Sequence, residues 1–234
     1  MKIDIQGLRH EYDIEVLKDL TIQLENVSSI ALIGVSGSGK STLLRLLSGI
    51  ETPSAGTVKV NDTDIRERTY KRRVGFVFQD HNLFPHLTLE RNITLILEET
   101  RKTPKEKARA IAQKNLEALQ LGDQMHKLPK HVSGGQAQRA SIARALALDP
   151  DVIFLDEPTA SLDPVLTHEV LMAVKKLRDF GKEFVFATHV ISFVKDFADY
   201  VIFMENGAIV EHGPPSIMDA PSTASMRAYM DKVH

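Results

Sequence analysis

Residues 34–42, GVSGSGKST, match the pattern Gly-x-x-x-x-Gly-Lys-Ser of a phosphate-binding loop. An apolar run at 29–34 predicts a buried strand before the loop, and residues 42–49 predict a helix after it. Because the loop glycines lack a Cβ, backbone N–H groups can turn toward phosphate oxygens at the positive end of that helix. We expect Lys40 to bridge the β- and γ-phosphates of a nucleoside triphosphate and Ser41 to bind Mg²⁺. The predicted nucleotide-binding residues here are Gly34, Ser36, Gly37, Ser38, Gly39, Lys40, Ser41 and Thr42.

Polar residues also follow three other apolar runs. Asp156 and Glu157 end the run VIFLDE, and open α/β sheets bind ligands at the carboxyl ends of their strands. Asp156 is then suited to hold Mg²⁺ through water, and Glu157 to polarise an attacking water as a general base. The acidic pair could instead cap the turn at Pro158. His189 and Gln79 end two further runs, where a structural histidine and an ordinary strand terminus are the alternatives.

A second small-residue helix start lies at residues 133–135, Ser-Gly-Gly. The apolar spacing of residues 136–148 predicts a helix, whose N-terminus would carry partial positive charge. This segment has neither the buried strand nor the lysine of the first loop. It therefore has only some of the parts of an anion site.

The pattern of apolar residues predicts the elements that position these groups. A parallel sheet covered on both faces is indicated by continuous apolar runs at 29–34, 73–79, 152–157 and 183–189. Half-exposed antiparallel strands are indicated by the alternation of apolar and polar residues at 2–6 and 20–24. Helical spacing dominates residues 80–150. We predict an α/β fold in which residues 1–79 and 151–234 form a P-loop core with an N-terminal antiparallel β subdomain. Residues 80–150 are predicted to form an inserted α-helical subdomain.

The composition excludes several classes of function. The 234 residues carry a formal charge of −2, which gives no electrostatic basis for binding nucleic acid. Zero cysteines exclude disulfides and thiolate metal sites. The first residues lack the apolar core of a signal peptide, and no apolar run approaches the length of a membrane span. If the protein works at a membrane, we expect it to do so through a partner.

The ordered motifs resemble those of the ATP-binding subunits of ABC transporters over essentially the whole chain. GVSGSGKST is similar to the Walker A motif, VIFLDEP to Walker B and VSGGQ to the signature motif, with Val132 where the family usually has leucine. Three single positions also match: Gln79 the Q-loop, His189 the switch histidine and Tyr12 the aromatic residue that stacks on adenine. Residues 161–163, SLD, match the D-loop.

The resemblance implies that two copies face each other head to tail around two ATP molecules. Each copy would then contact the ATP held by the other through Ser133, Gly134, Gly135, Gln136 and Asp163. The implied Mg²⁺ residues are Ser41, Gln79 and Asp156, and the implied catalytic residues are Glu157, His189 and Gln79. The second helix start is thereby interpreted as half of a composite site, completed by a second copy of the chain.

The resemblance also implies partners and a location. The implied partners are integral-membrane permease subunits and an extracytoplasmic solute-binding protein. The permease would hold the chain peripherally on the cytoplasmic face of the plasma membrane. The amino-acid sequences of residues 83–88 and of the C-terminal tail resemble those of the ATP-binding subunits of polar amino-acid importers. Phe84 in the first of these segments is either a contact for the membrane subunit or part of the core. The alternative function is a non-transport ATPase that drives a cell-division or lipoprotein-release machine. A soluble ATPase acting on DNA or ribosomes fits the charge less well.

Overall fold

The computed structural model describes residues 1–160, 162–178 and 181–233. The contacts divide the chain into two compact units. The first contains residues 1–74, 154–157 and 183–234, and the second contains residues 75–153 and 158–182. The predicted insertion 80–150 lies wholly within the second unit, which also takes in the segment after the acidic pair. The division of the chain at residues 79 and 151 stays a prediction.

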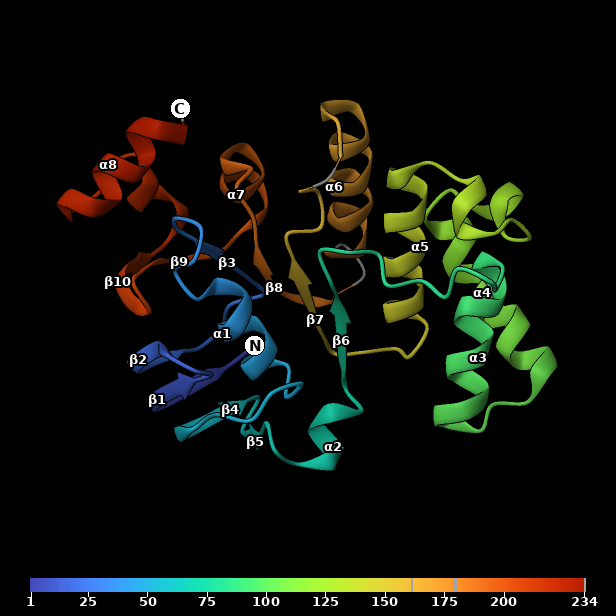
Figure 1. Ribbon diagram of the computed structural model, residues 1–234, viewed down its shortest axis with the longest axis horizontal. Helices are drawn as coiled ribbons and strands as arrows, with labels where there is room; N and C mark the ends of the chain where they lie inside the picture. Colours follow the sequence, from blue (N-terminus) through green and yellow to red (C-terminus); the bar gives the residue numbers. More distant parts are fainter. Residues whose placement is uncertain (161, 179–180, 234) are drawn as a thin grey trace. The chain divides into compact units, whose positions relative to one another are not determined.

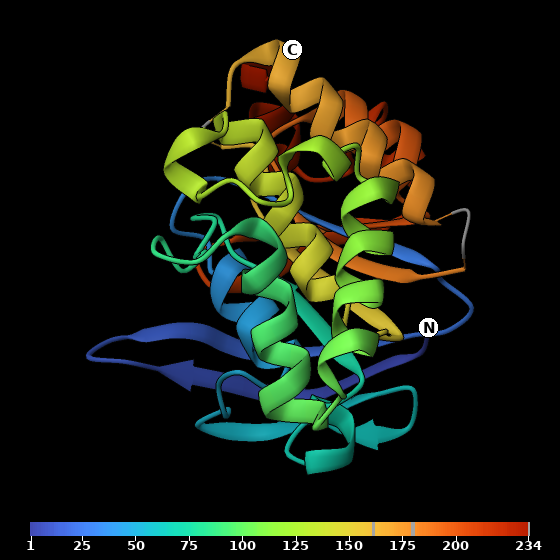
Figure 2. The ribbon, with the colours of Figure 1, turned by 90° about the vertical axis from the view of Figure 1, so that its right-hand side faces the viewer.

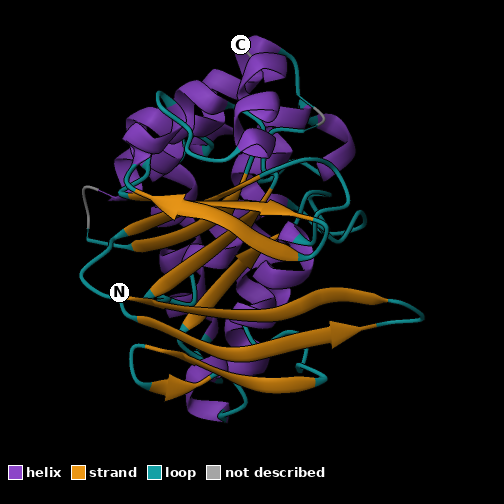
Figure 3. Ribbon diagram, turned by 90° about the vertical axis from the view of Figure 1, so that its left-hand side faces the viewer, coloured by secondary structure: helices purple, strands orange, loops and turns teal. Residues whose placement is uncertain are grey.

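An antiparallel sheet with strand order β2-β1-β4-β5 belongs to the first unit. Its strands are β1 (Ile3–Glu11), β2 (Glu15–Leu24), β4 (Ala55–Val60) and β5 (Thr63–Asp64). Figure 3 shows the long strands β1 and β2 side by side. They pair antiparallel, and Ile5 lies opposite Ile22 in their register. Buried and exposed residues alternate along much of both strands, as expected for a sheet with one face on the core.

A second sheet has the strand order β10-β9-β3-β8-β7-β6. Its strands are β3 (Ser29–Ile33), β6 (Val74–Val77), β7 (Val152–Asp156), β8 (Glu183–Ala187), β9 (Tyr200–Glu205) and β10 (Ala208–Gly213), labelled in Figure 1. β3 pairs in parallel with β8 on one side and β9 on the other. Every residue of β3 and of β7 is buried, which explains their unbroken apolar sequences. The carboxyl end of β3 leads directly into the phosphate loop.

The described part of the first unit also contains α1 (Lys40–Leu47), α2 (Arg68–Lys71), α7 (Ile191–Phe197) and α8 (Ala224–Val233), with the short 3₁₀ turn η3 (Pro215–Met218). The start of α8 is held by Glu211. Its carboxylate accepts the Ser222 and Thr223 backbone N–H groups, at 2.8 and 2.9 Å, and the Thr223 hydroxyl at 2.7 Å. Burial raises the pKa of Glu211, but these hydrogen bonds outweigh it and lower the pKa to about 2.

The second unit is mainly helical. It contains α3 (Leu89–Arg101), α4 (Lys105–Ala118), α5 (Gly134–Leu146), α6 (Pro164–Arg178) and the 3₁₀ turns η1 (Gly122–Gln124) and η2 (Pro129–His131). Figure 2 shows α3, α4 and α5 side by side, in agreement with their mutual contacts. Apolar residues such as Ile93, Ala112 and Ile142 are fully buried in this unit. Thr88 caps α3 by accepting the Arg91 N–H at 3.1 Å.

The structure confirms the predicted α/β fold with its antiparallel sheet and its helices between β6 and β7. Elements that were not predicted from the sequence include β4, β5, α2, α6 and α7. No helix within the described ranges is both long enough and apolar enough to cross a membrane.

Candidate active site

The phosphate loop connects β3 to α1, and its backbone requires glycine. Gly34 has a φ of 143°, and a Cβ placed there would lie 2.1 Å from the carbonyl oxygen of Met204 in β9. Gly37 has a φ of 78° but nothing within 4 Å of where its Cβ would be, so the loop is open at this point. Ser38 is 1% exposed, and its hydroxyl oxygen has no hydrogen-bond partner. The loop therefore presents free space and an unpartnered polar group.

Lys40 begins α1 and is buried, with 5% of its surface exposed. Its ammonium donates to the carbonyl oxygens of Gly34 at 2.9 Å and Val35 at 3.0 Å. Burial lowers the pKa of Lys40, while the charges of Glu157 and Asp156 act in the opposite direction. The lysine thus lies folded over its own loop, within the electrostatic reach of both acidic residues.

The two neighbouring acids at the end of β7 have different partners. The Asp156 carboxylate accepts the Ser41 hydroxyl at 2.8 Å, and burial raises the pKa of Asp156. The Glu157 carboxylate lies 2.9 Å from Nε2 of His189, and this hydrogen bond is the main reason why the pKa of Glu157 is lowered. Adjacent residues therefore face the loop serine and the histidine separately.

The backbone of Glu157 is unusual. Its φ of 44° is in the left-handed region, which costs energy for a residue with a side chain. Its N–H donates to the carbonyl oxygen of Ala187 at 3.0 Å, two residues before His189. This bond joins the ends of β7 and β8 and helps to hold the carboxylate beside the imidazole.

Tyr12 lies in the turn between β1 and β2 and is 52% exposed. Its hydroxyl donates to the Glu51 carboxylate at 2.5 Å, and burial raises the pKa of Tyr12. Glu51 was not among the predicted site residues. It lies 39 positions from Tyr12 and carries no motif, so the sequence holds no signal for this contact.

The remaining predicted residues belong to the second unit and are described there. Ser133 and Gln136 form a capping box at the start of α5: the Ser133 hydroxyl accepts the Gln136 N–H at 3.2 Å, and the Gln136 side chain accepts the Ser133 N–H at 3.0 Å. Ser133 and Gly134 are exposed, whereas Gly135 is buried, and its Cβ would lie 3.0 Å from Leu166. Close packing on the start of α6 is thus one structural reason for this glycine.

Three further positions belong to the signature motif, the D-loop and the Q-loop. Val132 has extended backbone angles, φ −124° and ψ 160°, which suit a β-branched side chain where the family usually has leucine. Asp163 is exposed, and its carboxylate accepts the Val165 and Leu166 N–H groups at 2.9 and 3.0 Å, so it supports the start of α6. Gln79 is exposed two residues after β6. Ser161 of the predicted D-loop lies outside the described residues.

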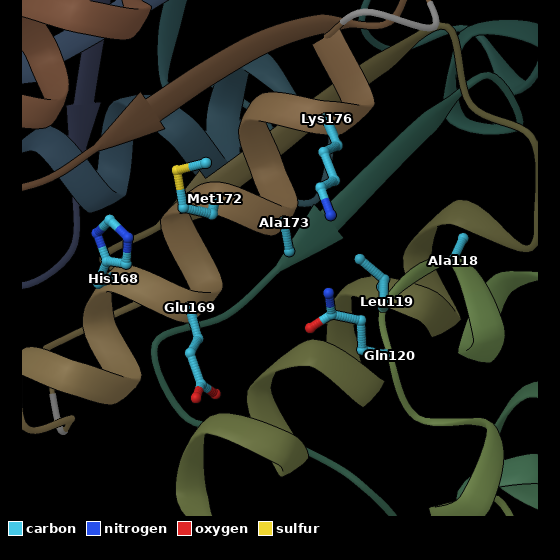
Figure 4. A pocket seen from close by; sticks show the side chains of 8 residues that line it. All are labelled: Ala118, Leu119, Gln120, His168, Glu169, Met172, Ala173 and Lys176. Atoms are coloured by element: carbon cyan, nitrogen blue, oxygen red, sulfur yellow. The ribbon is translucent and has the colours of Figure 1, made fainter.

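A cavity of about 160 Å³ in the second unit contains none of the predicted site residues. Figure 4 shows the side chains that line it, from the end of α4 and from α6. Two of these side chains, Gln120 and Glu169, contact the guanidinium of Arg139, which is 6% exposed, at 3.3 and 3.2 Å. The residues that line this cavity include none of the phosphate loop.

The fold and the phosphate loop define a P-loop nucleoside triphosphatase. The family described as "ABC transporter" matches residues 17–160 of the chain. The glutamine transport ATP-binding protein GlnQ of Geobacillus stearothermophilus is 38% identical over 227 residues, 94% of each chain. The arginine transport ATP-binding protein ArtM of Bacillus subtilis is 40% identical over 225 residues, again 94% of each chain.

Solved structures agree with this assignment. The dimeric post-hydrolysis structure of the ATP-binding cassette MJ0796, bound to ADP and Pi, has a TM-score of 0.81 and 29% sequence identity, over 91% of this chain and 98% of that one. The chain belongs to the ABC transporter family, and it is an ATPase of the ATP-binding cassette type.

Proposed function

We propose that this chain hydrolyses ATP to drive a membrane importer of polar amino acids, acting as a pair of identical copies. One observation carries the catalytic part. Within a single compact unit, a lysine, a serine–aspartate pair and a glutamate–histidine pair gather at the carboxyl ends of β3, β7 and β8. The cargo class is supported by the names of two relatives, a glutamine transport and an arginine transport ATP-binding protein.

The loop residues would bind the phosphates of ATP by exchanging partners. Two carbonyl oxygens now take hydrogen bonds from Lys40, and phosphate oxygens would take their place. The buried hydroxyl of Ser38 has no partner to give up, so it is free to donate to a phosphate oxygen. The open space at Gly37 leaves room for the phosphate chain.

The residues at the start of α1 also fit a magnesium ion. The Ser41 hydroxyl and the Asp156 carboxylate are hard oxygen donors 2.8 Å apart, and Mg²⁺ favours few protein oxygens together with water and substrate phosphates. The described residues contain no group of three or more acidic, histidine or cysteine side chains that could hold a metal without such additional ligands. Mg²⁺, when bound, would neutralise charge on the β- and γ-phosphates. Gln79 is proposed as a further ligand from the family resemblance.

Glu157 and His189 would act on the attacking water. The hydrogen bond from His189 keeps the Glu157 carboxylate ionised but weakens it as a base. If His189, which is 46% exposed, turned toward the γ-phosphate, the carboxylate would lose that bond and its pKa would rise. We therefore propose that Glu157 accepts the proton of the attacking water more readily once His189 has changed partner.

The capping box at α5 would serve the ATP of the other copy. The exposed Ser133 and Gly134 lie at the positive end of a 13-residue helix, and Gly135, Gln136 and Asp163 are proposed to contribute to the same contact. Moving a two-state equilibrium from 1:99 to 99:1 needs about 5.5 kcal/mol, or roughly 2.7 kcal/mol for each of two ATP molecules. One or two hydrogen bonds to a charged γ-phosphate supply that much, so hydrolysis would reopen the pair.

Membrane partners follow from the same proposal. Permease subunits would hold the chain at the cytoplasmic face of the membrane, with a solute-binding protein on the other side. Phe84, 40% exposed, is the proposed contact, and its loop is fixed by the fully buried Asn92, which accepts the Phe84 N–H at 2.7 Å. Uptake of labelled glutamine and arginine in cells lacking this chain, with a sugar as control, tests the cargo class.

The variant Glu157→Gln tests the ATPase mechanism. An amide cannot accept a proton from water, yet it has the same shape and accepts the same backbone conformation. We expect normal ADP binding, ATP turnover reduced at least about 100-fold, and a dimer that accumulates with ATP and Mg²⁺. Size-exclusion chromatography with ADP in place of ATP is the control. A monomer in both nucleotides would contradict the proposed pair.

A further inference from the structure

Tyr12 is an exposed aromatic residue that is nevertheless fixed at its far end. Half of its surface is open to solvent, at 52%, but its hydroxyl donates to the Glu51 carboxylate at 2.5 Å. A tyrosine in a turn between two strands has no covering core to restrict its rotamer. This hydrogen bond therefore restrains the direction of the ring.

A second aromatic ring supports the first. The His10 ring meets the Tyr12 ring edge to face, with centroids 4.8 Å apart and planes at 88°. His10 is 7% exposed, neither of its ring nitrogens has a hydrogen-bond partner, and Nε2 lies 3.5 Å from the Glu51 carboxylate. The histidine thus packs behind the tyrosine rather than reaching toward a ligand.

Glu51 is itself attached to the phosphate-loop helix. Its N–H donates to the carbonyl oxygen of Arg45 at 3.2 Å, and its carboxylate lies 3.6 Å from the Arg45 guanidinium. Arg45 is in the last turn of α1, whose first residue is Lys40. A backbone bond from Ser54 N–H to the Arg9 carbonyl oxygen, 3.0 Å long, ties the same segment to the end of β1. One scaffold therefore carries both the loop lysine and the tyrosine.

We propose that Glu51, backed by His10, is a positioning residue that holds the Tyr12 ring ready to stack on the nucleobase. The proposal rests on the proposed function, in which Tyr12 contacts adenine. Because the ring is ordered when the chain folds, base binding need not restrict it. Loss of this pre-ordering should weaken nucleotide binding by about 2- to 12-fold, the cost of immobilising one side chain. Phosphate binding at the loop should not change.

The experiment measures ADP binding by calorimetry in wild type and in a set of variants. ADP avoids any step that needs the γ-phosphate. Tyr12→Phe keeps the ring but removes its hydroxyl, and Glu51→Ala removes the acceptor. Both should weaken ADP binding by the same factor, and the double variant should bind no more weakly than either, because each breaks the same bond. Glu51→Gln, whose amide oxygen still accepts, should restore part of the affinity. Glu11→Gln, on the exposed end of β1, is the matched control.

A ligand without a base separates positioning from general structural support. Inorganic tripolyphosphate should inhibit the ATPase equally in wild type and in Glu51→Ala. Equal weakening of tripolyphosphate and ADP would overturn the proposal, because Glu51 would then support the phosphate loop. Unchanged ADP affinity in Glu51→Ala would also overturn it. If Tyr12→Leu bound ADP as wild type does, the premise that Tyr12 stacks on the base would be wrong. If the wild-type chain bound no nucleotide at all, the proposed function itself would be refuted.

Discussion

Replacement of Gly34 by alanine tests whether the phosphate loop is constrained by its contact with β9. The new Cβ would lie 2.1 Å from the carbonyl oxygen of Met204, a backbone atom that cannot rotate away. Met204 follows Phe203, which is paired with Ile33 in the parallel β3–β9 ladder. Relief of the clash to 3.0 Å requires a shift of about 0.9 Å between the loop and β9, so the ladder beside it must distort.

The magnitude follows from three costs. A side chain in left-handed backbone costs about 1–2 kcal/mol, overpacking of a buried site about 1–3 kcal/mol, and each weakened ladder bond up to about 1.5 kcal/mol. With one weakened ladder bond, Gly34→Ala should therefore lower the free energy of unfolding by about 2–6 kcal/mol. Gly37→Ala is the matched control, since its φ is also positive, at 78°, but its Cβ would meet nothing within 4 Å. It should lose only about 1–2 kcal/mol.

Urea unfolding followed by circular dichroism, without nucleotide, measures both variants against wild type. Nucleotide must be left out because a bound ligand stabilises the native state by mass action. The expected result is a clearly lower midpoint for Gly34→Ala than for Gly37→Ala. Equal midpoints would refute the reasoning, because they would mean that the loop moves away from Met204 without cost.

Two further predictions concern the second unit and the C-terminal helix. Ser133→Asp and Ser133→Asn both keep a residue type that caps helices, but the aspartate adds negative charge where the γ-phosphate of the other copy's ATP is proposed to bind. ATPase assays should show a much larger loss of activity for the aspartate variant, with ADP binding unchanged in both variants. Equal activity of the two variants would contradict the composite site. Glu211→Gln should destabilise the chain at neutral pH. The pKa of Glu211 is about 2 in the folded chain, against an ordinary value of 4.5 for a glutamate that stands for the unfolded chain. The stability that its ionised carboxylate contributes is therefore complete above pH 4.5 and is lost as the pH falls toward 2. The difference in unfolding free energy between wild type and variant should therefore shrink over that range, and a constant difference would exclude the ionised carboxylate as its cause.

The sequence predicted the buried strands well because their environment leaves little choice of residue. β3 and β7 are buried along their whole length and read as unbroken apolar runs. β4 begins with the exposed Ala55 and the half-buried Gly56 and has only two buried positions, so its pattern is too weak to identify. Local periodicity therefore identified the central strands and the helices α3, α4 and α5. It missed the long helix α6 as well as short elements whose stability comes from their neighbours.

The candidate site shows the same division between local and distant information. The phosphate loop, the acidic pair and His189 could be predicted because each follows an apolar run at a recognisable position. The partner of Tyr12 could not, since a hydrogen bond across 39 residues depends on how β1 and the segment after α1 come together. The left-handed backbone of Glu157 was equally hidden, because glutamate has no preference for that region.

The hydrogen bonds of the site suggest why such a chain can cycle. Lys40 donates to carbonyl oxygens of its own loop, Ser41 to Asp156, and Glu157 is paired with His189, so each reactive group already has a protein partner. A phosphate, metal ion or water that binds must replace those bonds, and the net gain is the difference between two sets of charge-assisted contacts. Exchange of this kind keeps binding reversible and gives the groups a defined arrangement to return to after the γ-phosphate leaves. Pre-ordered contacts such as Tyr12 with Glu51 then matter more, because they add affinity without exchanging a bond.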